Sequence, residues 1–410
     1  MAGDRERTAG QFLRLIRVAT CVPVLTLVFL LGLEIYLRQG NPVDRLGYRS
    51  VDIWNLANRV EICRKTKPEL ALVGSSLLLV LNQDKTGTHF YTGSYPPYLQ
   101  SLLRKACGDD VSCINLCSGM QMVPEAYMVS EAVTNAEAYP KVIVYGIALR
   151  EFVDFTYSAE WTGEGFNSLS AYVKPDPFFL YNLYSVETIR EFLLCHYSYI
   201  YRDRNDLKFM LSGMTKNWLE NLPLDQHFTR MGSDHSWKPQ KEGYLMETWI
   251  PRRMEKFGEE VYRKNPEFLR NYYMKYQKMM YQRAYTQRDR LERGLGVQQH
   301  YFKNLIELCE KKKIFLVVVD MPMSKEFISL APPGFYDSFK AFLKEGADNN
   351  KFILIDLVDD PDFDNTSYKD GVHLSYPGAR LLAEKLTAIF KEKYPGLLEA
   401  MERQHKLNHR

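Results

Sequence analysis

The chain has 410 residues, of which 46% are apolar and 25% are charged, and its formal net charge is +3. A chain of this length buries a sizeable core, as one large domain or two moderate ones. The nearly balanced charge, without a basic stripe interleaved with aromatic residues, gives no case for a nucleic-acid-binding protein.

An apolar segment lies near the N-terminus. Residues 18–33 carry no charge, and with Glu34 tolerated the run continues to Leu37. About 20 apolar residues span a bilayer core, and buried helices of soluble proteins rarely stand at an N-terminus behind a basic flank. No small-residue cleavage site follows, so we predict that residues 18–37 are an uncleaved signal anchor. The basic residues favour only weakly a cytoplasmic N-terminus (1–17) with the rest of the chain outside.

The rest of the chain alternates between two patterns after a predicted linker at 38–66. Short apolar runs without alternation predict strands buried on both faces, at 70–75, 112–117, 141–147, 314–320 and 352–357. Helical patterns lie near 97–107, 124–136, 297–312, 335–346 and 377–393. This order predicts an α/β fold with a doubly wound, flavodoxin-like parallel sheet, followed by a charged tail at 396–410.

The alternation is interrupted between the third and fourth predicted strands. Residues 151–297 are too many for a loop and too rich in aromatic residues and helix formers for disorder. We therefore predict a helical insertion that divides the α/β domain into residues 67–150 and 298–395. Its last part is expected to form one or two amphipathic helices that end at Gly294 and Gly296.

Six cysteines lie outside the predicted anchor, an even number that permits disulfides. Cys107 and Cys113 flank a Gly-Asp-Asp turn, and we expect them to form a disulfide if the domain is exported. The alternative is that they are free, mostly buried thiols. No pair has zinc-ligand spacing with histidine, so we expect no structural metal. No cofactor is expected either.

Two serines follow the first predicted strand, in the sequence Gly74-Ser75-Ser76. Ligands of open α/β sheets bind outside the carboxyl ends of the strands, which is where a nucleophilic serine would be useful. The alternative is that Ser76 caps the helix that follows, a common use of serine.

A second motif lies just ahead of the last predicted helix, where Asp370 and His373 are separated by two residues. A short loop turns both side chains to one side, so that the imidazole acts as general base and the carboxylate orients it. Together with a serine at a strand end, the motif favours nucleophilic catalysis.

These residues resemble the SGNH/GDSL hydrolase superfamily. Gly74 to Leu77 is similar to its first block, with Ser76 at the nucleophile's position, and the sequence from Asp370 to Ser375 with Pro377-Gly378 resembles its last block. "NLCSGMQ", residues 115–121, resembles the second block, whose glycine would be Gly119. The resemblance covers about 70–150 and 298–393 and implies Ser76, His373 and Asp370 as a catalytic triad, with a backbone oxyanion donor at Gly119.

The chain departs from the family pattern in two places. Ser75 replaces the usual aspartate of the first block, and the usual Gly-x-Asn-Asp after the third strand is absent. Arg150, which follows that strand, supplies charge to an oxyanion or a substrate anion in one interpretation. In the other, it forms a salt bridge with Glu151 or Asp154.

Both departures and the N-terminal anchor resemble a membrane-anchored subset of the superfamily. This subset includes the teichoic-acid D-alanylation protein and relatives of alginate O-acetylation proteins. The resemblance implies a serine acyl-esterase or O-acyltransferase that acts outside the cytoplasm beside a membrane-bound O-acyltransferase, with an acyl donor and a cell-surface polysaccharide acceptor. The alternative is a non-catalytic, membrane-tethered partner or polymer-binding protein on a degenerate hydrolase scaffold.

Overall fold

The computed structural model describes residues 23–40, 56–82, 95–107, 111–119, 121–136, 138–153, 169, 172–174, 186–204, 207–208, 210–212, 214–215, 266–399 and 401. The chain divides into two compact units. One combines residues 1–50 with 194–243, and the other combines 51–193 with 244–410.

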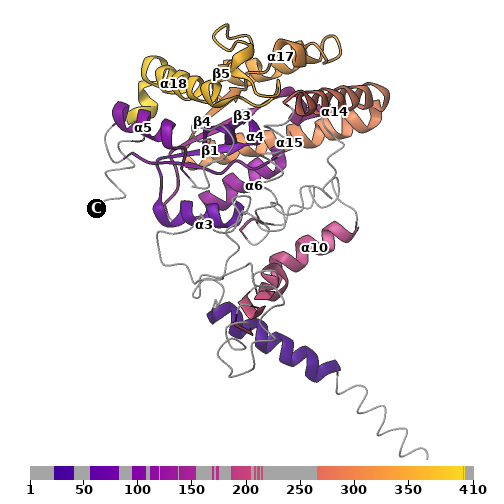
Figure 1. Cartoon of the computed structure of the whole chain (residues 1–410). Coiled ribbons are helices and arrows are strands. Elements are labelled where there is room, and N and C mark those ends of the chain that lie inside the picture. Colours follow the sequence, from indigo (N-terminus) through magenta and orange to yellow (C-terminus); the bar gives the residue numbers. More distant parts are fainter. Residues whose placement is uncertain are drawn as a thin grey trace, which may run out of the picture. The chain divides into compact units, whose positions relative to one another are not determined.

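The larger unit is an α/β structure built on a five-stranded, all-parallel sheet (Figure 1). Its strands are β1 (Leu70–Gly74), β2 (Cys113–Asn115), β3 (Val142–Ile147), β4 (Phe315–Asp320) and β5 (Ile353–Asp356). They lie in the order β2-β1-β3-β4-β5. All five coincide with predicted strands, and their ends either agree with the prediction or are one or two residues shorter.

Helices cover both faces of the sheet, because alternate strand side chains point to opposite sides. Ala71 and Val73 belong to one apolar cluster, and Leu70 and Leu72 belong to another. The first cluster includes residues of α3 (Leu56–Thr66), α6 (Val123–Thr134), α14 (Pro266–Thr286), α15 (Arg288–Lys312) and α17 (Phe335–Asp348). The second includes residues of α5 (Pro97–Cys107) and α18 (Tyr376–Lys393). The shorter elements of this unit are α4 (Ser76–Leu79), η1 (Val80–Asn82), α7 (Leu149–Val153), α16 (Lys325–Ile328) and η2 (Asn365–Ser367).

Helix α15 corrects one sequence expectation, since it passes through Gly294 and Gly296 and does not end there. A glycine inside a helix costs about 1 kcal/mol relative to alanine. Burial of Leu291, Val297 and Tyr301 on this helix outweighs that cost, because most helix stability in proteins comes from an apolar face packed on a core.

The predicted linker and tail also contain packed residues. Helix α3 occupies the end of the 38–66 interval, and its Leu56, Val60 and Cys63 are buried in the core. In the tail expected from residue 396, Leu397 and Met401 are buried as well. Each of these intervals carries apolar side chains at helical spacing.

The smaller unit contains the N-terminal helix, Pro23–Gly40, which is long and apolar enough to cross a membrane. Its mean hydropathy is 1.3 and none of it is buried inside the structure, unlike the core helix of a soluble protein. A signal sequence near an N-terminus has the same length and composition. The unit also contains α11 (Tyr199–Arg202) and the last residues of α10 (Val186–Tyr197).

Candidate functional site

The first strand ends in a sharp turn that only glycine permits. Gly74 has φ +141°, and a Cβ placed there would lie 2.6 Å from the carbonyl oxygen of Gly146 on the neighbouring strand β3. The chain therefore leaves β1 abruptly and enters α4. The two serines stand at this turn, at the carboxyl edge of the sheet.

The two serines have different surroundings. Ser75 is fully buried and is the N-cap of α4, where its Oγ accepts a hydrogen bond of 3.4 Å from the Leu77 N–H. Ser76 is the first residue of the helix and is half-buried. The capping role considered for Ser76 therefore belongs to Ser75, which leaves the Ser76 hydroxyl for another partner.

The loop that carries Asp370 and His373 is a tight reversal between β5 and α18. Its two sides meet in an antiparallel bridge between Tyr368 and Leu374. Gly371 has φ +83° at the turn, and a Cβ there would come within 2.3 Å of the Phe327 ring. This backbone returns His373 toward the carboxyl edge of the sheet.

The structure brings Ser76, His373 and Asp370 into one chain of contacts. Ser76 Oγ lies 2.8 Å from His373 Nε2. On the other side of the ring, His373 Nδ1 lies 2.8 Å from Asp370 Oδ2. A carboxylate bound at Nδ1 fixes the proton on that nitrogen, so Nε2 is an acceptor directed at the serine hydroxyl.

Asp370 is held as a charged partner of the histidine by burial and backbone hydrogen bonds. Its side chain is 0% exposed, and its Oδ1 accepts hydrogen bonds from the backbone N–H groups of Val372 (3.1 Å) and His373 (2.7 Å). Burial raises the pKa of this carboxyl, but the charge and hydrogen bonds of His373, with the Val372 N–H, outweigh burial and leave the pKa below its ordinary value. The group is therefore ionised in the pH range where a histidine base is useful.

A tyrosine of the predicted insertion contacts the same histidine. The Tyr273 ring on α14 meets the His373 ring edge to face, with ring centroids 5.1 Å apart. His373 itself is only 7% exposed. Part of the expected insertion thus contributes to the wall of the site.

The loop after β2 is fastened to the end of β1. Ser118 donates its N–H to the Gly74 carbonyl (3.1 Å), and Gln121 Oε1 accepts from the Gly74 N–H (2.6 Å). Gln121 Nε2 also donates to the Leu116 carbonyl (3.2 Å). Gly119 is exposed on the turn between these contacts. Sequence reasoning missed Gln121, although a buried glutamine directly after a buried strand is a recognisable signal.

Arg150 does not join this chain of contacts: in the described part of the molecule it forms no hydrogen bond with Ser76, His373 or Asp370, and neither does Gly119. It lies half-buried on α7, where its charge acts on Glu151. Asp154, the other partner considered, lies outside the described residues.

Glu151 is fully buried beside the serines, which the sequence did not indicate. Its Oε2 accepts a hydrogen bond from the Ala148 N–H (3.2 Å). Burial raises the pKa of this carboxyl to about 7, although the charge of Arg150 and a hydrogen bond with the Ser75 side chain lower it. The Glu151 carboxyl therefore lies next to the N-cap serine, with its Oε1 buried and without a hydrogen-bond partner among the described residues.

The predicted disulfide is not formed. Cys113 is a free thiol, wholly buried on β2 in register with Leu70, whereas Cys107 ends helix α5. Burial raises the pKa of the Cys113 thiol well above its ordinary value, which keeps it protonated. The alternative of buried thiols is the one that the structure shows for Cys113.

No protein-family model matches the chain, and no curated protein matches it.

Proposed function

We propose that this chain is a membrane-anchored serine acyl-esterase or O-acyltransferase of the SGNH type. The observation that carries the proposal is the continuous contact from Ser76 through His373 to Asp370, with 2.8 Å on each side of the imidazole. A binding module needs none of these three groups in this arrangement, whereas acyl transfer through a serine needs all of them.

In the first half of the reaction, His373 Nε2 takes the proton of the Ser76 hydroxyl as Oγ attacks the carbonyl carbon of an acyl ester. The carbonyl double bond opens to an oxyanion, for which the backbone N–H groups of Ser76 and Gly119 are our candidate donors. The oxyanion then re-forms the carbonyl, the bond to the leaving group breaks, and His373 returns the proton to that group. The product is an acyl ester of Ser76.

In the second half, a hydroxyl acceptor or water gives its proton to His373 and attacks the acyl-serine. The Ser76 oxygen leaves and recovers the proton, so no net proton is consumed in transfer to an alcohol. Transfer and hydrolysis differ in whether an acceptor displaces water from the site. Tyr273 against the imidazole supports a role of the insertion in covering it.

The wider proposal places the catalytic unit outside the cytoplasm, acting on a cell-surface polysaccharide beside a membrane-bound O-acyltransferase. The unburied apolar helix Pro23–Gly40 supports membrane anchorage. The strand order β2-β1-β3-β4-β5 supports the doubly wound, flavodoxin-like interpretation. Protease shaving of intact cells tests the orientation: cleavage of the large unit from outside is expected, and protection of it until the cells are lysed would contradict it.

A fluorophosphonate probe tests the catalytic proposal on the full chain, because it reacts with an activated serine. We expect labelling at Ser76, identified by peptide mass spectrometry, and its loss in Ser76→Ala and His373→Ala. The Ser75→Ala protein is the matched control and should still be labelled. A folded wild-type chain that takes up no probe would overturn the proposal in favour of a non-catalytic scaffold.

A further inference from the structure

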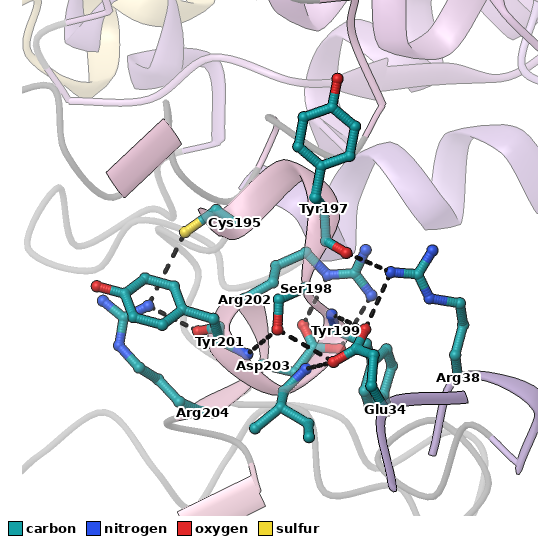
Figure 2. Close-up of polar contacts among 11 residues, drawn as sticks. Glu34, Arg38, Cys195, Tyr197, Ser198, Tyr199, Tyr201, Arg202, Asp203 and Arg204 are labelled. Atoms are coloured by element: carbon teal, nitrogen blue, oxygen red, sulfur yellow. Dashed lines mark hydrogen bonds and ion pairs between the residues drawn. The ribbon is translucent and has the colours of Figure 1, made fainter. Parts of the chain in front are cut away.

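The C-terminal end of the N-terminal helix makes specific contacts with a distant part of the smaller unit (Figure 2). Arg38 Nη2 donates to the backbone carbonyl of Tyr197 at 2.7 Å, although 159 residues separate the two. The same guanidinium contacts Glu34 at 2.9 Å, one helical turn earlier. This end of the helix is therefore joined to the chain near residue 197.

Glu34 caps a second helix. Its carboxylate accepts hydrogen bonds from the Ser198 hydroxyl (3.0 Å), the Ile200 N–H (3.0 Å) and the Tyr199 N–H, as Figure 2 shows for the labelled residues. The first N–H groups of any helix lack partners within it. In α11, Ser198 Oγ accepts from the Tyr201 N–H (3.1 Å), and Glu34 accepts from the Tyr199 and Ile200 N–H groups that precede it. An acidic side chain near the end of an apolar helix thereby acquires a structural role.

Apolar contacts reinforce the polar ones. Leu37 and Ile200 pack against a small buried cluster formed by Tyr199, Leu207 and Met210. The contact thus combines charged hydrogen bonds with buried apolar surface.

If the helix spans a bilayer, the contact fixes the depth of the segment. At a rise of 1.5 Å per residue, a helical span over the predicted anchor, residues 18–37, is about 30 Å long, the thickness of the hydrocarbon core. Arg38 then follows the end of the span, and Glu34 lies about one helical turn before it. Residues 197–200, which are hydrogen-bonded to Glu34 and Arg38, therefore lie within about one helix diameter, roughly 10 Å, of the membrane surface.

The side chains of this segment suit such a position. Tyr197, Leu211 and Met214 are 65%, 59% and 49% exposed. Arg202 and Arg204 lie over the rings of Tyr199 and Tyr201, at 5.2 and 4.1 Å from the ring centroids. Tyrosine is enriched at membrane interfaces, and arginine there extends its charge toward the headgroups.

We infer that the described residues of 194–215, here called the juxtamembrane segment, form a lipid-binding surface that Glu34 and Arg38 hold against the exit of the membrane span. The occupant is the bilayer interface, into which Tyr197, Leu211 and Met214 insert. Lipid is favoured as the occupant because the juxtamembrane segment packs directly against the unburied apolar helix. This inference rests on the proposed membrane anchorage.

The test uses the full chain in phosphatidylcholine nanodiscs that contain nitroxide-labelled lipid. Single cysteines that carry a fluorophore are placed at Leu211→Cys and Met214→Cys, and unmodified protein supplies the background from native thiols. We expect several-fold stronger quenching by the lipid nitroxide at these two positions than at Lys391→Cys, an exposed site on α18. Equal quenching at all three positions would overturn the inference and would favour a protein partner at Leu211 and Met214.

Two further variants separate the inference from the anchorage. A fluorophore at Phe29→Cys, in the apolar helix, must be quenched if that helix is in the membrane, so its failure would contradict the anchor itself. Combining Leu211→Cys with Glu34→Ala should reduce quenching at residue 211, whereas Gln39→Ala on the same helix should not. Unchanged quenching in the Glu34→Ala protein would contradict the role assigned to that carboxylate.

Discussion

At the residue scale, the two adjacent serines perform different tasks. Ser75 is buried and caps a helix, while Ser76 contacts His373. The difference follows from the turn at Gly74, after which only one of two consecutive side chains faces the carboxyl edge of the sheet. The apolar stretch around Gly74 therefore contains two hydroxyls of which one caps a helix and the other lies against His373.

Removing either end of the Ser76–His373 contact is expected to abolish acyl transfer. Ser76→Ala and His373→Ala should each lower kcat by several orders of magnitude, and the double variant should lose little more, because the two act as a unit. Asp370→Ala should cost less, since the imidazole keeps its contact with the serine. Hydrolysis of a chromogenic acyl ester measures all four, and additive losses in the double variant would contradict a shared role.

Ser75→Ala should act on stability more than on chemistry. Loss of a serine N-cap costs about 1 kcal/mol of unfolding free energy, and Ser75 also contacts the buried Glu151. We expect a lower urea midpoint with kcat reduced only mildly. If Ser75→Ala abolished activity while Ser76→Ala preserved it, the assignment of the two serines would be reversed.

At the element scale, the loop between β2 and α6 is positioned by one side chain. Gln121 is fully buried and binds the Gly74 N–H through its carbonyl oxygen at 2.6 Å. It thereby links the exit of β2 to the turn that presents Ser76. The same contact fixes the position of the turn at Gly119, which lies two residues before Gln121.

Gln121→Met tests the link, because methionine fills a similar volume and accepts no strong hydrogen bond. The Gly74 N–H would be left buried and unsatisfied, at a cost of about 1–3 kcal/mol. If Gly119 is an oxyanion donor, kcat should fall while KM changes little.

Gln298→Met on α15 is the matched control. Gln298 is also buried, but its carbonyl oxygen has no partner in the described part of the chain, so the change should leave kcat unaltered. Equal losses of kcat in both variants would show that the effect comes from general destabilisation.

At the scale of the whole molecule, buried carboxyls make stability depend on pH. Burial raises the pKa of Glu151 to about 7 and that of Glu125 to about 8, from an ordinary value of 4.5. The folded chain therefore holds protons that the unfolded chain has lost between pH 4.5 and 8. Stability from these groups is present at pH 4.5 and is lost as the pH rises through their folded pKa values.

Glu151→Gln should flatten this dependence, because the amide cannot ionise and still accepts from the Ala148 N–H. Between pH 5 and pH 8, the variant should lose less unfolding free energy than wild type. The difference should be on the order of 3 kcal/mol at most. Urea unfolding at both pH values measures it, with the exposed Glu345→Gln as control. An equal wild-type and variant slope would contradict an ionising Glu151.

Several features of this protein follow from the sequence because their causes are local. Apolar runs without alternation locate the strands of a parallel sheet. Ser375 caps α18 next to the Asp370–His373 loop, and Pro377 and Gly378 stand in the first turn of that helix. Since the carboxyl ends of parallel strands meet at one edge, the order of motifs predicts that Ser76 and His373 lie near each other, and the reversal at Gly371 completes the approach. Ser76 and His373 are 297 residues apart in the sequence, and the parallel arrangement of the strands places them in contact.

Other features are decided only by tertiary packing. Helix α15 continues through two glycines because neighbouring side chains on the helix are buried, and Cys113 is a buried thiol because β2 holds it inside the sheet. Gln121 against Gly74 and Glu34 against Ile200 are contacts between segments whose sequences carry no sign of each other. Local periodicity determines which residues form an element and which face is apolar. The hydrogen-bond partner of a buried polar group depends on which distant segment packs against it. The free energy gained from that hydrogen bond arises only when the two segments meet in the folded chain.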